Sequence, residues 1–501
     1  MKKFVIVGSG SAGLIAAGMI KKYWKDGVDI TVIHDKSQGS IAVGESTTPY
    51  IHAFLTFCGI SEKDLIRDLD VTIKLGINFK NWIPDTEYFH GFGQITGQNG
   101  WNKLRSSDPS ATYSILNDVY SGGSLYNEPM TKVPTTIFDN FSHALHIDTR
   151  QFTDYLYEKL NGDIKFVDDV VTRVRVNTEC TKIESVECKY NGIFDADYFI
   201  DASGFNTILF KHLNPKWNDM SKYLPIDRAI PQQIPYDFKD ELPSYTLAEA
   251  TDNGWIWRIP IGDRYGTGYL YSSKFTSDEE AREKYNDWLV ENFKTKLTSD
   301  RIIKYRPGYY EDYWMGNCLA VGLSSGFVEP LESTGIHIII KQIQEFINYN
   351  SNLKNLEFNR KSANLINKNI YVDVVNFVAL HYNTNRTDSE FWKHVKDNKP
   401  DWVKDIDEKI REGSVDASIY RNNPLSSLWT LDSYVQVTNG LKMISKESIQ
   451  NHLNSKPEGN GVFASGEQIL EVCKNMHDCE VSEKNNQVFV SHKGIIDSIH
   501  K

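Results

Sequence analysis

Cysteine is scarce in this chain, which has six in 501 residues: Cys58, Cys180, Cys188, Cys318, Cys473 and Cys479. So low a count argues against a disulfide framework and favours a reducing compartment, so a cytoplasmic protein is expected. Cys473, His477 and Cys479 lack a fourth nearby ligand and the C-x-x-C spacing of zinc sites, so no bound metal is predicted.

Long apolar runs are missing as well. No segment reaches the roughly 18 apolar residues that a membrane-spanning helix requires, so no membrane association is expected. The N-terminal run Lys3–Val7 stops at Gly8, which is too early for a secretion signal and typical of a buried strand.

Positive charge is in deficit, because 55 Lys and Arg face 66 Asp and Glu and give a formal net charge of −11. A surface that binds nucleic acid needs a basic face, so no nucleic-acid partner is expected. Aromatic residues, in contrast, make up 12% of the chain, which suits stacking on a flat ligand.

The first motif with chemical content is a glycine-rich turn, G-x-G-x-x-G, between the Lys3–Val7 strand and a helical pattern over residues 14–24. Its glycines allow the backbone to approach a pyrophosphate at a helix N-terminus. Asp35, 22 residues after the last glycine, can accept hydrogen bonds from ribose hydroxyls. The turn residues predicted to bind the cofactor are Gly8, Gly10, Ser11, Ala12 and Gly13. This motif alone leaves FAD and NAD(P) open.

Two later apolar strands bear on the choice of cofactor. Residues 197–205 form an apolar segment that ends in a turn of small residues, as in flavoproteins with two dinucleotide folds, and this favours FAD. Residues 318–322 form another such strand, and Gly322 at its end is predicted to bind the cofactor as well.

The segment Phe327–Gly335 leads into an amphipathic helix, because Ile336, Ile339, Ile340 and Ile343 recur at helical spacing. Ser333 or Thr334 stands where an N-cap belongs, and the helix N-terminus favours an anion. Glu332 places a carboxyl group beside that anion site. Many helices begin in this way without any function.

Residues 71–79 alternate apolar and polar side chains with a period of two, which predicts a half-buried strand with Lys74 on its polar face. The simplest interpretation of such a lysine is a solvated side chain. Residues 351–450 are predicted to be mostly helical, and 451–501 carry little pattern.

Together these segments resemble the flavin-dependent halogenases of the tryptophan-halogenase type over roughly residues 1–350. The residues that carry the resemblance, besides Gly8, Gly10 and Gly13, are Val43–Pro49, which is similar to a G-E-x-T-x-P element; Lys74, Gly76, Phe79, Asn81 and Trp82; Trp255, Trp257, Ile259 and Pro260; and Phe327, Pro330, Ser333 and Gly335. The resemblance adds Val43, Gly44, Glu45 and Ser46 to the expected cofactor-binding residues.

The resemblance implies an α/β fold, namely the FAD-binding dinucleotide fold of the flavin monooxygenase type. Residues 1–350 are expected to form the FAD-binding module, with inserted substrate-site segments at about 61–139 and 216–299. Residues 351–501 are expected to form a mostly helical cap over the substrate.

The resemblance also implies a reaction. A separate flavin reductase supplies reduced FAD, which with oxygen and a halide ion (chloride, bromide or iodide) gives hypohalous acid. Ser333, Thr334 and Gly335 are expected to hold the halide. The acid then reaches Lys74, which binds it by a hydrogen bond or carries it as a haloamine. Glu332 polarises the oxidant or accepts the proton from the ring that is halogenated.

The expected substrate is a small, electron-rich aromatic molecule. His90 and Phe92 are similar to a turn that holds an indole in the family, with Gly91 in place of a proline. Trp429 is a third predicted substrate contact. The late cluster that grips free tryptophan has no match around residues 427–434, which favours another indole or a phenol.

Two alternatives remain at this stage. A single-component flavin hydroxylase would bind NAD(P)H itself and would not need Lys74. A flavin-binding module without turnover would need neither Lys74 nor Glu332. The presence of both residues in matching motifs favours the halogenase, while the native substrate, the preferred halide and the oligomeric state stay open.

Overall fold

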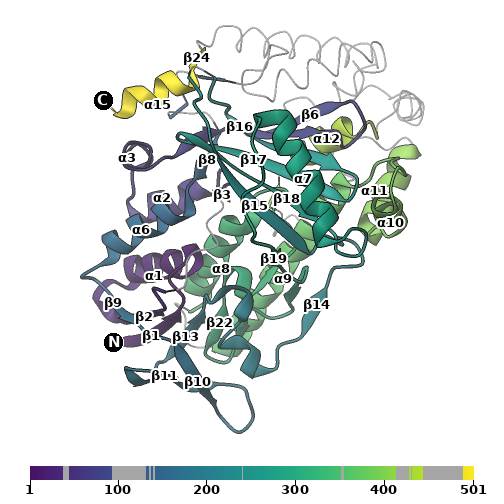
Figure 1. Cartoon of the computed structure of the whole chain (residues 1–501). Coiled ribbons are helices and arrows are strands. Elements are labelled where there is room, and N and C mark those ends of the chain that lie inside the picture. The colour runs from purple at the N-terminus through teal and green to yellow at the C-terminus, as the bar shows by residue number, and fades with distance from the viewer. Residues whose placement is uncertain are drawn as a thin grey trace, which may run out of the picture.

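A computed structural model describes residues 1–37, 45–92, 131–134, 137–138, 142–239, 241–350, 355–412, 428–429, 431–443 and 489–500 (Figure 1). Its helices are α1 (Ser11–Trp24), α2 (Ile51–Cys58), α3 (Glu62–Asp68), α6 (Thr149–Leu160), α7 (Asp278–Phe293), α8 (Thr334–Asn350), α9 (Leu356–His381), α10 (Glu390–Asp397), α11 (Asp401–Arg411), α12 (Leu431–Gly440) and α15 (His492–His500).

The dinucleotide-binding part is built on a six-stranded sheet in the order β21 (Trp314–Met315), β22 (Cys318–Ala320), β13 (Tyr198–Asp201), β1 (Lys2–Val7), β2 (Val28–His34) and β9 (Lys165–Asp168). All neighbours are parallel except the edge pair β21–β22. Alternate side chains of β1 enter different cores, because Phe4 and Ile6 pack on the side of α1 and α8. Val5 and Val7 pack on the opposite side. This is the α/β dinucleotide fold predicted from the sequence.

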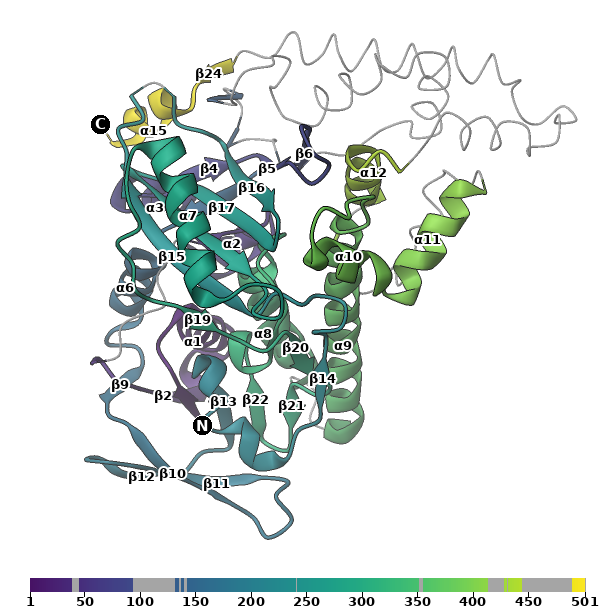
Figure 2. The same cartoon turned by 45° about the vertical axis from the view of Figure 1, so that its right-hand side comes forward.

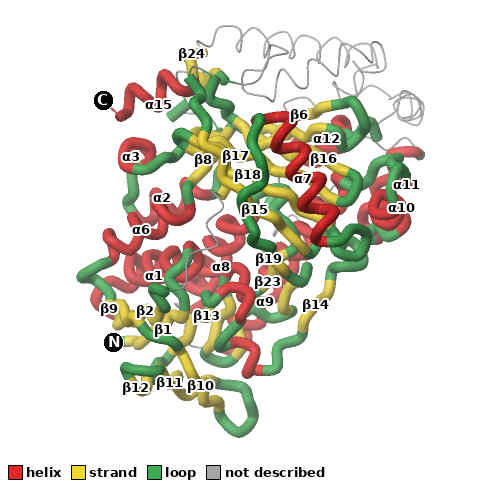
Figure 3. Tube along the Cα trace, viewed as in Figure 1, coloured by secondary structure: helices red, strands yellow, loops and turns green. Residues whose placement is uncertain are grey.

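A second large sheet carries the parts of the chain inserted between these strands. Its order is β19 (Ile303–Lys304), β15 (Arg228–Pro235), β18 (Arg264–Tyr271), β17 (Gly254–Ile261), β16 (Tyr245–Thr251), β5 (Gly76–Lys80) and β6 (Glu87–Gly91). Helices α1 and α8 lie between the two large sheets (Figure 3). Smaller sheets contain β10 (Val171–Val176), β11 (Ile183–Cys188) and β12 (Gly192–Phe194); β14 (Trp217–Asp219), β20 (Gly308–Tyr310) and β23 (Gly326–Phe327); and β3 (Glu45–Ser46), β8 (Ala144–Ile147) and β4 (Thr72–Lys74).

The strand predicted over residues 71–79 is two strands that belong to different sheets. β4 pairs with β8, and β5 pairs with β16 and β6, with the change of partner at Leu75. Both faces are therefore covered, and the Lys74 side chain is fully buried, which corrects its expected place on a polar face. Gly76 permits the crossing, because a Cβ there would lie 2.3 Å from the carbonyl oxygen of His90.

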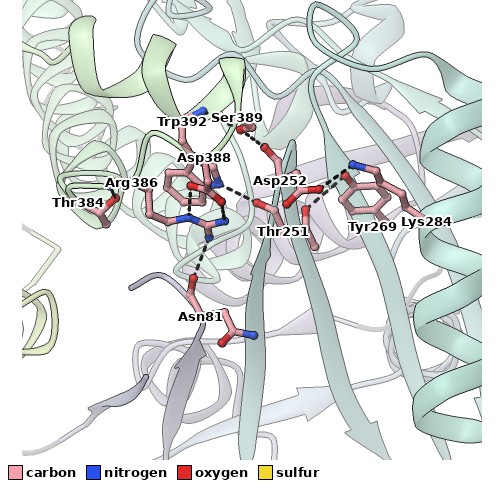
Figure 4. Close-up of polar contacts among 10 residues, drawn as sticks. All are labelled: Asn81, Thr251, Asp252, Tyr269, Lys284, Thr384, Arg386, Asp388, Ser389 and Trp392. Carbon is pink, nitrogen blue, oxygen red and sulfur yellow. Dashed lines mark hydrogen bonds and ion pairs between the residues drawn. The ribbon is translucent and has the colours of Figure 1, made fainter. Parts of the chain in front are cut away.

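Helices α9, α10, α11 and α12 contribute most of their buried side chains to a separate core against the second sheet, and α9 is the long upright helix to the right of centre in Figure 2. Arg386, just beyond α9, fastens this region to the sheet (Figure 4). It donates to the carbonyl oxygen of Asn81 at 2.8 Å and to Asp388 at 3.0 Å, and it lies 4.2 Å from the ring centroid of Trp392. The Trp392 indole donates to the carbonyl oxygen of Thr251 at 2.8 Å. Asn81, one of the residues of the Lys74–Trp82 motif, therefore binds the region after α9 through its carbonyl oxygen.

Within the described residues, no helix combines the length and apolar character needed to cross a membrane. The cysteines in this part of the chain (Cys58, Cys180, Cys188 and Cys318) are free thiols.

The C-terminal end returns to the first half of the chain. β24 (Phe489–Ser491) pairs with β7 (Lys132–Pro134), and α15 lies beside α3, away from α10 and α11 (Figures 1 and 2). Buried His492 accepts from the backbone N–H of Ile73 at 3.0 Å and donates to the carbonyl oxygen of Leu242 at 3.2 Å. The end of the chain therefore holds the backbone next to Lys74.

We expect His492→Ala to lower the free energy of unfolding by ~1–3 kcal/mol, because the buried N–H of Ile73 loses its acceptor. Burial lowers the pKa of His492 to about 4, from an ordinary value of 6.5. The unfolded chain then binds the proton more readily, so the contribution of His492 decreases as the pH falls from 6.5 toward 4. Urea unfolding at pH 7 and pH 5 tests this, with exposed His500→Ala on the same helix as the control.

Candidate active site

Two glycines of the glycine-rich turn, Gly8 and Gly13, are closely packed, and Gly10 faces open space. Gly8 has a φ of 110°, and a Cβ there would lie 2.3 Å from the carbonyl oxygen of Ala202. A Cβ on Gly13 would lie 2.0 Å from the carbonyl oxygen of Gly8. A Cβ on Gly10, in contrast, would meet nothing within 4 Å. The backbone at Gly10 therefore faces space that a ligand can fill.

The start of α1 fits the pyrophosphate of FAD. Gly10 is its N-cap and supplies no side-chain hydrogen bond, and the first turn contains no acidic residue. The buried hydroxyl of Ser11 has no hydrogen-bond partner among the described residues. Unfilled N–H groups at a helix N-terminus together with an unpartnered hydroxyl suit an anionic ligand rich in oxygen.

The end of β2 brings His34 rather than Asp35 to the glycine turn. His34 Nδ1 lies 2.9 Å from the hydroxyl of Ser9. The carboxylate of Asp35 instead accepts from the backbone N–H and the hydroxyl of Ser37, at 2.9 and 2.6 Å. Both of these bonds end on Oδ1, and a carboxylate can accept further hydrogen bonds, so ribose binding by Asp35 stays a prediction.

The segment after Gly44 connects several parts of the site, whereas Val43 and Gly44 themselves lie outside the described residues. Glu45 and Ser46 form β3, and the Ser46 hydroxyl lies 2.8 Å from that of Thr246. Thr48 bonds His337 of α8 at 3.0 Å. Gly322 lies close to α1 and α8, since a Cβ there would be 3.0 Å from the Ala12 side chain of α1 and 3.2 Å from Ile339 of α8.

Lys74 ends in a buried polar pocket formed by distant segments. Its ammonium donates to the carbonyl oxygen of Thr47 at 2.9 Å and to the hydroxyl of Ser333 at 3.0 Å. The Phe92 ring centroid lies 5.1 Å away. Burial lowers the pKa of Lys74 to about 7, and the charge of Glu332 acts in the opposite direction. Lys74 can therefore gain or lose a proton near neutral pH.

Glu332 lies between two histidines, of which His381 was not predicted from the sequence. Its oxygens are 3.0 and 3.1 Å from His90 Nδ1, and Oε1 is 2.8 Å from His381 Nε2. His381 Nδ1 faces the carbonyl oxygen of Phe377 at 2.9 Å and must carry a proton, because a carbonyl only accepts. Burial by itself would raise the pKa of Glu332, but His90 and His381 lower it to about 2. Glu332 is thus a carboxylate at neutral pH, with His90 and His381 on either side of it.

The three residues predicted to bind halide differ in which of their hydrogen-bonding groups are already engaged within the protein. Ser333 has a φ of 59°, its N–H donates to the carbonyl oxygen of Pro330 at 3.0 Å, and its hydroxyl accepts from Lys74. Thr334 and Gly335 begin α8, where backbone N–H groups have no helical partner. A Cβ on Gly335 would meet nothing within 4 Å, so open space adjoins this end of the helix.

Two of the three predicted substrate residues, His90 and Trp429, pack against Phe377, which the sequence did not single out. Trp429 stacks on Phe377 with ring centroids 4.1 Å apart, and His90 lies 5.7 Å from the same ring. His90 is almost wholly buried, and Phe92 is half-buried. Phe377 lies within the apolar run of α9, and nothing in that pattern distinguishes it from an ordinary core residue.

The chain was compared with known proteins. A family model described as tryptophan halogenase matches residues 3–456. The tryptophan 7-halogenase RebH of Lentzea aerocolonigenes is 30% identical over 88% of this chain and 90% of its own length. The tryptophan 6-halogenase SttH of Streptomyces toxytricini is 31% identical over 79% of this chain and 80% of its own. The solved structure of SttH has a TM-score of 0.83 at 25% identity and covers all of both chains.

A further solved structure shows the shared fold alone. Xcc4156, a flavin-dependent halogenase from Xanthomonas campestris, has a TM-score of 0.84 at 23% identity, covering 99% of this chain and 98% of its own.

The family match and the dinucleotide fold together define a flavin-dependent oxidoreductase. The chain belongs to the tryptophan halogenase family. It is therefore an enzyme of the flavin-dependent halogenase type, and this confirms both the resemblance and the FAD-binding fold expected from the sequence.

Proposed function

We propose that this enzyme halogenates an electron-rich aromatic substrate, an indole or a phenol, at Lys74 and Glu332. Bound FAD, reduced by a separate flavin reductase, supplies with oxygen and halide the hypohalous acid that this step needs. One observation supports the proposal best. Lys74 donates a hydrogen bond to Ser333, and Ser333 directly follows Glu332 in the chain, so the buried lysine contacts the same loop that carries the buried carboxylate.

Lys74 orients the hypohalous acid. Two of its N–H groups point at Thr47 and Ser333. An ammonium has three donors, so the third remains for the oxygen of the acid. Burial lowers the pKa of Lys74 to about 7, but the charge of Glu332 opposes burial and keeps the ammonium populated up to that pH, so we favour the hydrogen-bonded form over a haloamine.

As the ring attacks the halogen, the oxygen–halogen bond breaks and the oxygen leaves as water with a proton from the Lys74 ammonium. Glu332 accepts the proton that the aromatic ring then loses. Its low pKa makes it a carboxylate at neutral pH, and a carboxylate is an acceptor and not a donor. The two histidines keep both oxygens in place, which holds the carboxylate in one orientation.

The halide binds at the start of α8, formed by Thr334 and Gly335, where open space adjoins the Cβ position of Gly335. A halide needs no directional partner, which suits a helix N-terminus. Ser333 contributes by fixing Lys74 beside this site, since its own N–H is engaged with Pro330.

The substrate lies beside Phe92 and Trp429. His90, the third predicted contact, is hydrogen-bonded to Glu332. The relatives RebH and SttH are named for halogenating tryptophan, which supports an indole ring. The unmatched late cluster favours an indole other than the free amino acid.

The decisive experiment supplies the full-length enzyme with FAD, a flavin reductase, NADH, oxygen and bromide, together with tryptophan, other indoles and phenols. Brominated products, recognised by mass and by the isotope pair of bromine, are the expected result. Hydroxylated product that forms without bromide would instead identify a flavin hydroxylase. Flavin binding without product from any substrate would identify a non-catalytic module.

The yield of brominated product per flavin oxidised is expected to fall as the pH rises above about 7, roughly tenfold per pH unit. Deprotonation of Lys74 removes the third donor, and its pKa of about 7 sets where the fall begins. A rising yield would favour the haloamine. A fall that persisted in Lys74→Arg, whose charge does not titrate in this range, would assign the titration to another group.

A further inference from the structure

Three side chains outside the active site bring metal-ligating atoms together. His52 lies on α2, Glu62 begins α3, and His143 directly precedes β8. Their ligand atoms all lie within 4.8 Å of one another. His143 Nε2 is 2.6 Å from Glu62 Oε1, and His52 Nδ1 is 3.8 Å from Glu62 Oε2. Glu62 and His143 are 81 residues apart, so no short motif marks the group in the sequence.

The hydrogen bonds of His52 leave a lone pair pointing at the carboxylate. His52 Nε2 faces the carbonyl oxygen of His143 at 3.1 Å, and a carbonyl only accepts, so Nε2 carries the proton. In the neutral ring Nδ1 then has only a lone pair to present to Glu62 Oε2. Two acceptors face each other, and a cation between them would bind both.

We propose that His52, Glu62 and His143 bind a divalent transition-metal ion, with Zn²⁺ preferred. Two imidazoles and one carboxylate are a ligand set that Zn²⁺ takes, with water as the fourth ligand. Tetrahedral ligands about 2 Å from zinc lie about 3.3 Å apart, and the two measured separations bracket that value. The N–H of His52 on a backbone carbonyl is the outer contact that orients metal-binding histidines.

The three side chains are accessible to an ion from solvent, and they lie beside the strand that carries Lys74. The His52 side chain is 31% exposed, Glu62 16% and His143 6%, so the group is open on one side. Ala144, next to His143, pairs with Lys74 across β8 and β4. A bound ion would therefore join α2 and α3 to the strand that supports Lys74.

Zinc titration of the full-length, tag-free enzyme after chelator treatment tests the proposal by calorimetry. We expect one Zn²⁺ per chain with a roughly micromolar or tighter dissociation constant and a higher melting temperature on binding. Co²⁺ in place of Zn²⁺ should give the visible absorption of a tetrahedral site with nitrogen and oxygen ligands.

Two substitutions localise the binding. His52→Ala and the near-isosteric Glu62→Gln should each weaken Zn²⁺ binding by at least ~100-fold, since each removes a ligand. His212→Ala, at an exposed histidine in the short turn Phe210–Leu213, should leave it unchanged. Less than one equivalent in the wild type, or one equivalent that survives both substitutions, would overturn the proposal.

Discussion

Lys74→Ala is expected to abolish halogenated product, with a loss of at least ~10³-fold, while reduced flavin is still oxidised. The substitution removes the donor that orients the hypohalous acid and leaves the carbonyl oxygen of Thr47 and the hydroxyl of Ser333 without it. The glycine turn that fits FAD involves other segments, so flavin binding should not change. Product per turnover, measured by mass spectrometry, and flavin oxidation, measured by absorbance, separate the two effects.

Lys80→Ala is the matched control for this substitution. Lys80 ends the next strand, its side chain is partly exposed, and it forms an ion pair with the largely buried Glu249 at 3.0 Å, away from the contacts of Lys74, so its loss should leave product formation unchanged. Halogenated product at wild-type yield from Lys74→Ala would remove Lys74 from the mechanism. Loss of flavin oxidation together with product would indicate a damaged fold and not a missing catalytic group.

The sequence singled out Lys74 as a candidate but did not indicate how its environment is built. A period-two pattern over residues 71–79 looks the same for one strand as for two strands joined at Leu75. The change of partner from β8 to β16 depends on long-range pairing, which no local pattern contains. Burial of Lys74, and hence its lowered pKa, depends on that pairing and on the segments of Thr47 and Ser333 that meet its side chain.

The dinucleotide fold was easier to predict, because its signal is local. Gly8, Gly10 and Gly13 lie within one turn, and the flanking strand and helix adjoin them in the chain. His381 is the opposite case, since it ends a long helix and meets Glu332 only through tertiary packing. The FAD-binding fold was therefore predictable, whereas the histidines that fix the carboxylate required coordinates.

Glu329 and Glu332 show how environment sets the chemistry of two buried glutamates on one loop. Burial raises the pKa of Glu329 to about 8, and its carboxyl group accepts from the hydroxyl of Tyr382 at 3.0 Å. His90 and His381 lower the pKa of Glu332 to about 2 against the effect of burial. At pH 7 the first is thus a neutral acid and the second a carboxylate.

Glu332→Gln is therefore expected to lower the rate of halogenation by ~10²–10³-fold, because an amide cannot accept the proton of the ring. Glu329→Gln replaces a neutral acid by a neutral amide of the same shape and should leave the rate within about tenfold of wild type. Single-turnover product formation at pH 7 compares the two variants. Equal losses in both would show that buried shape, and not the charge on Glu332, limits the reaction. A loss confined to Glu332→Gln, with flavin oxidation intact, would assign the proton transfer to that carboxylate.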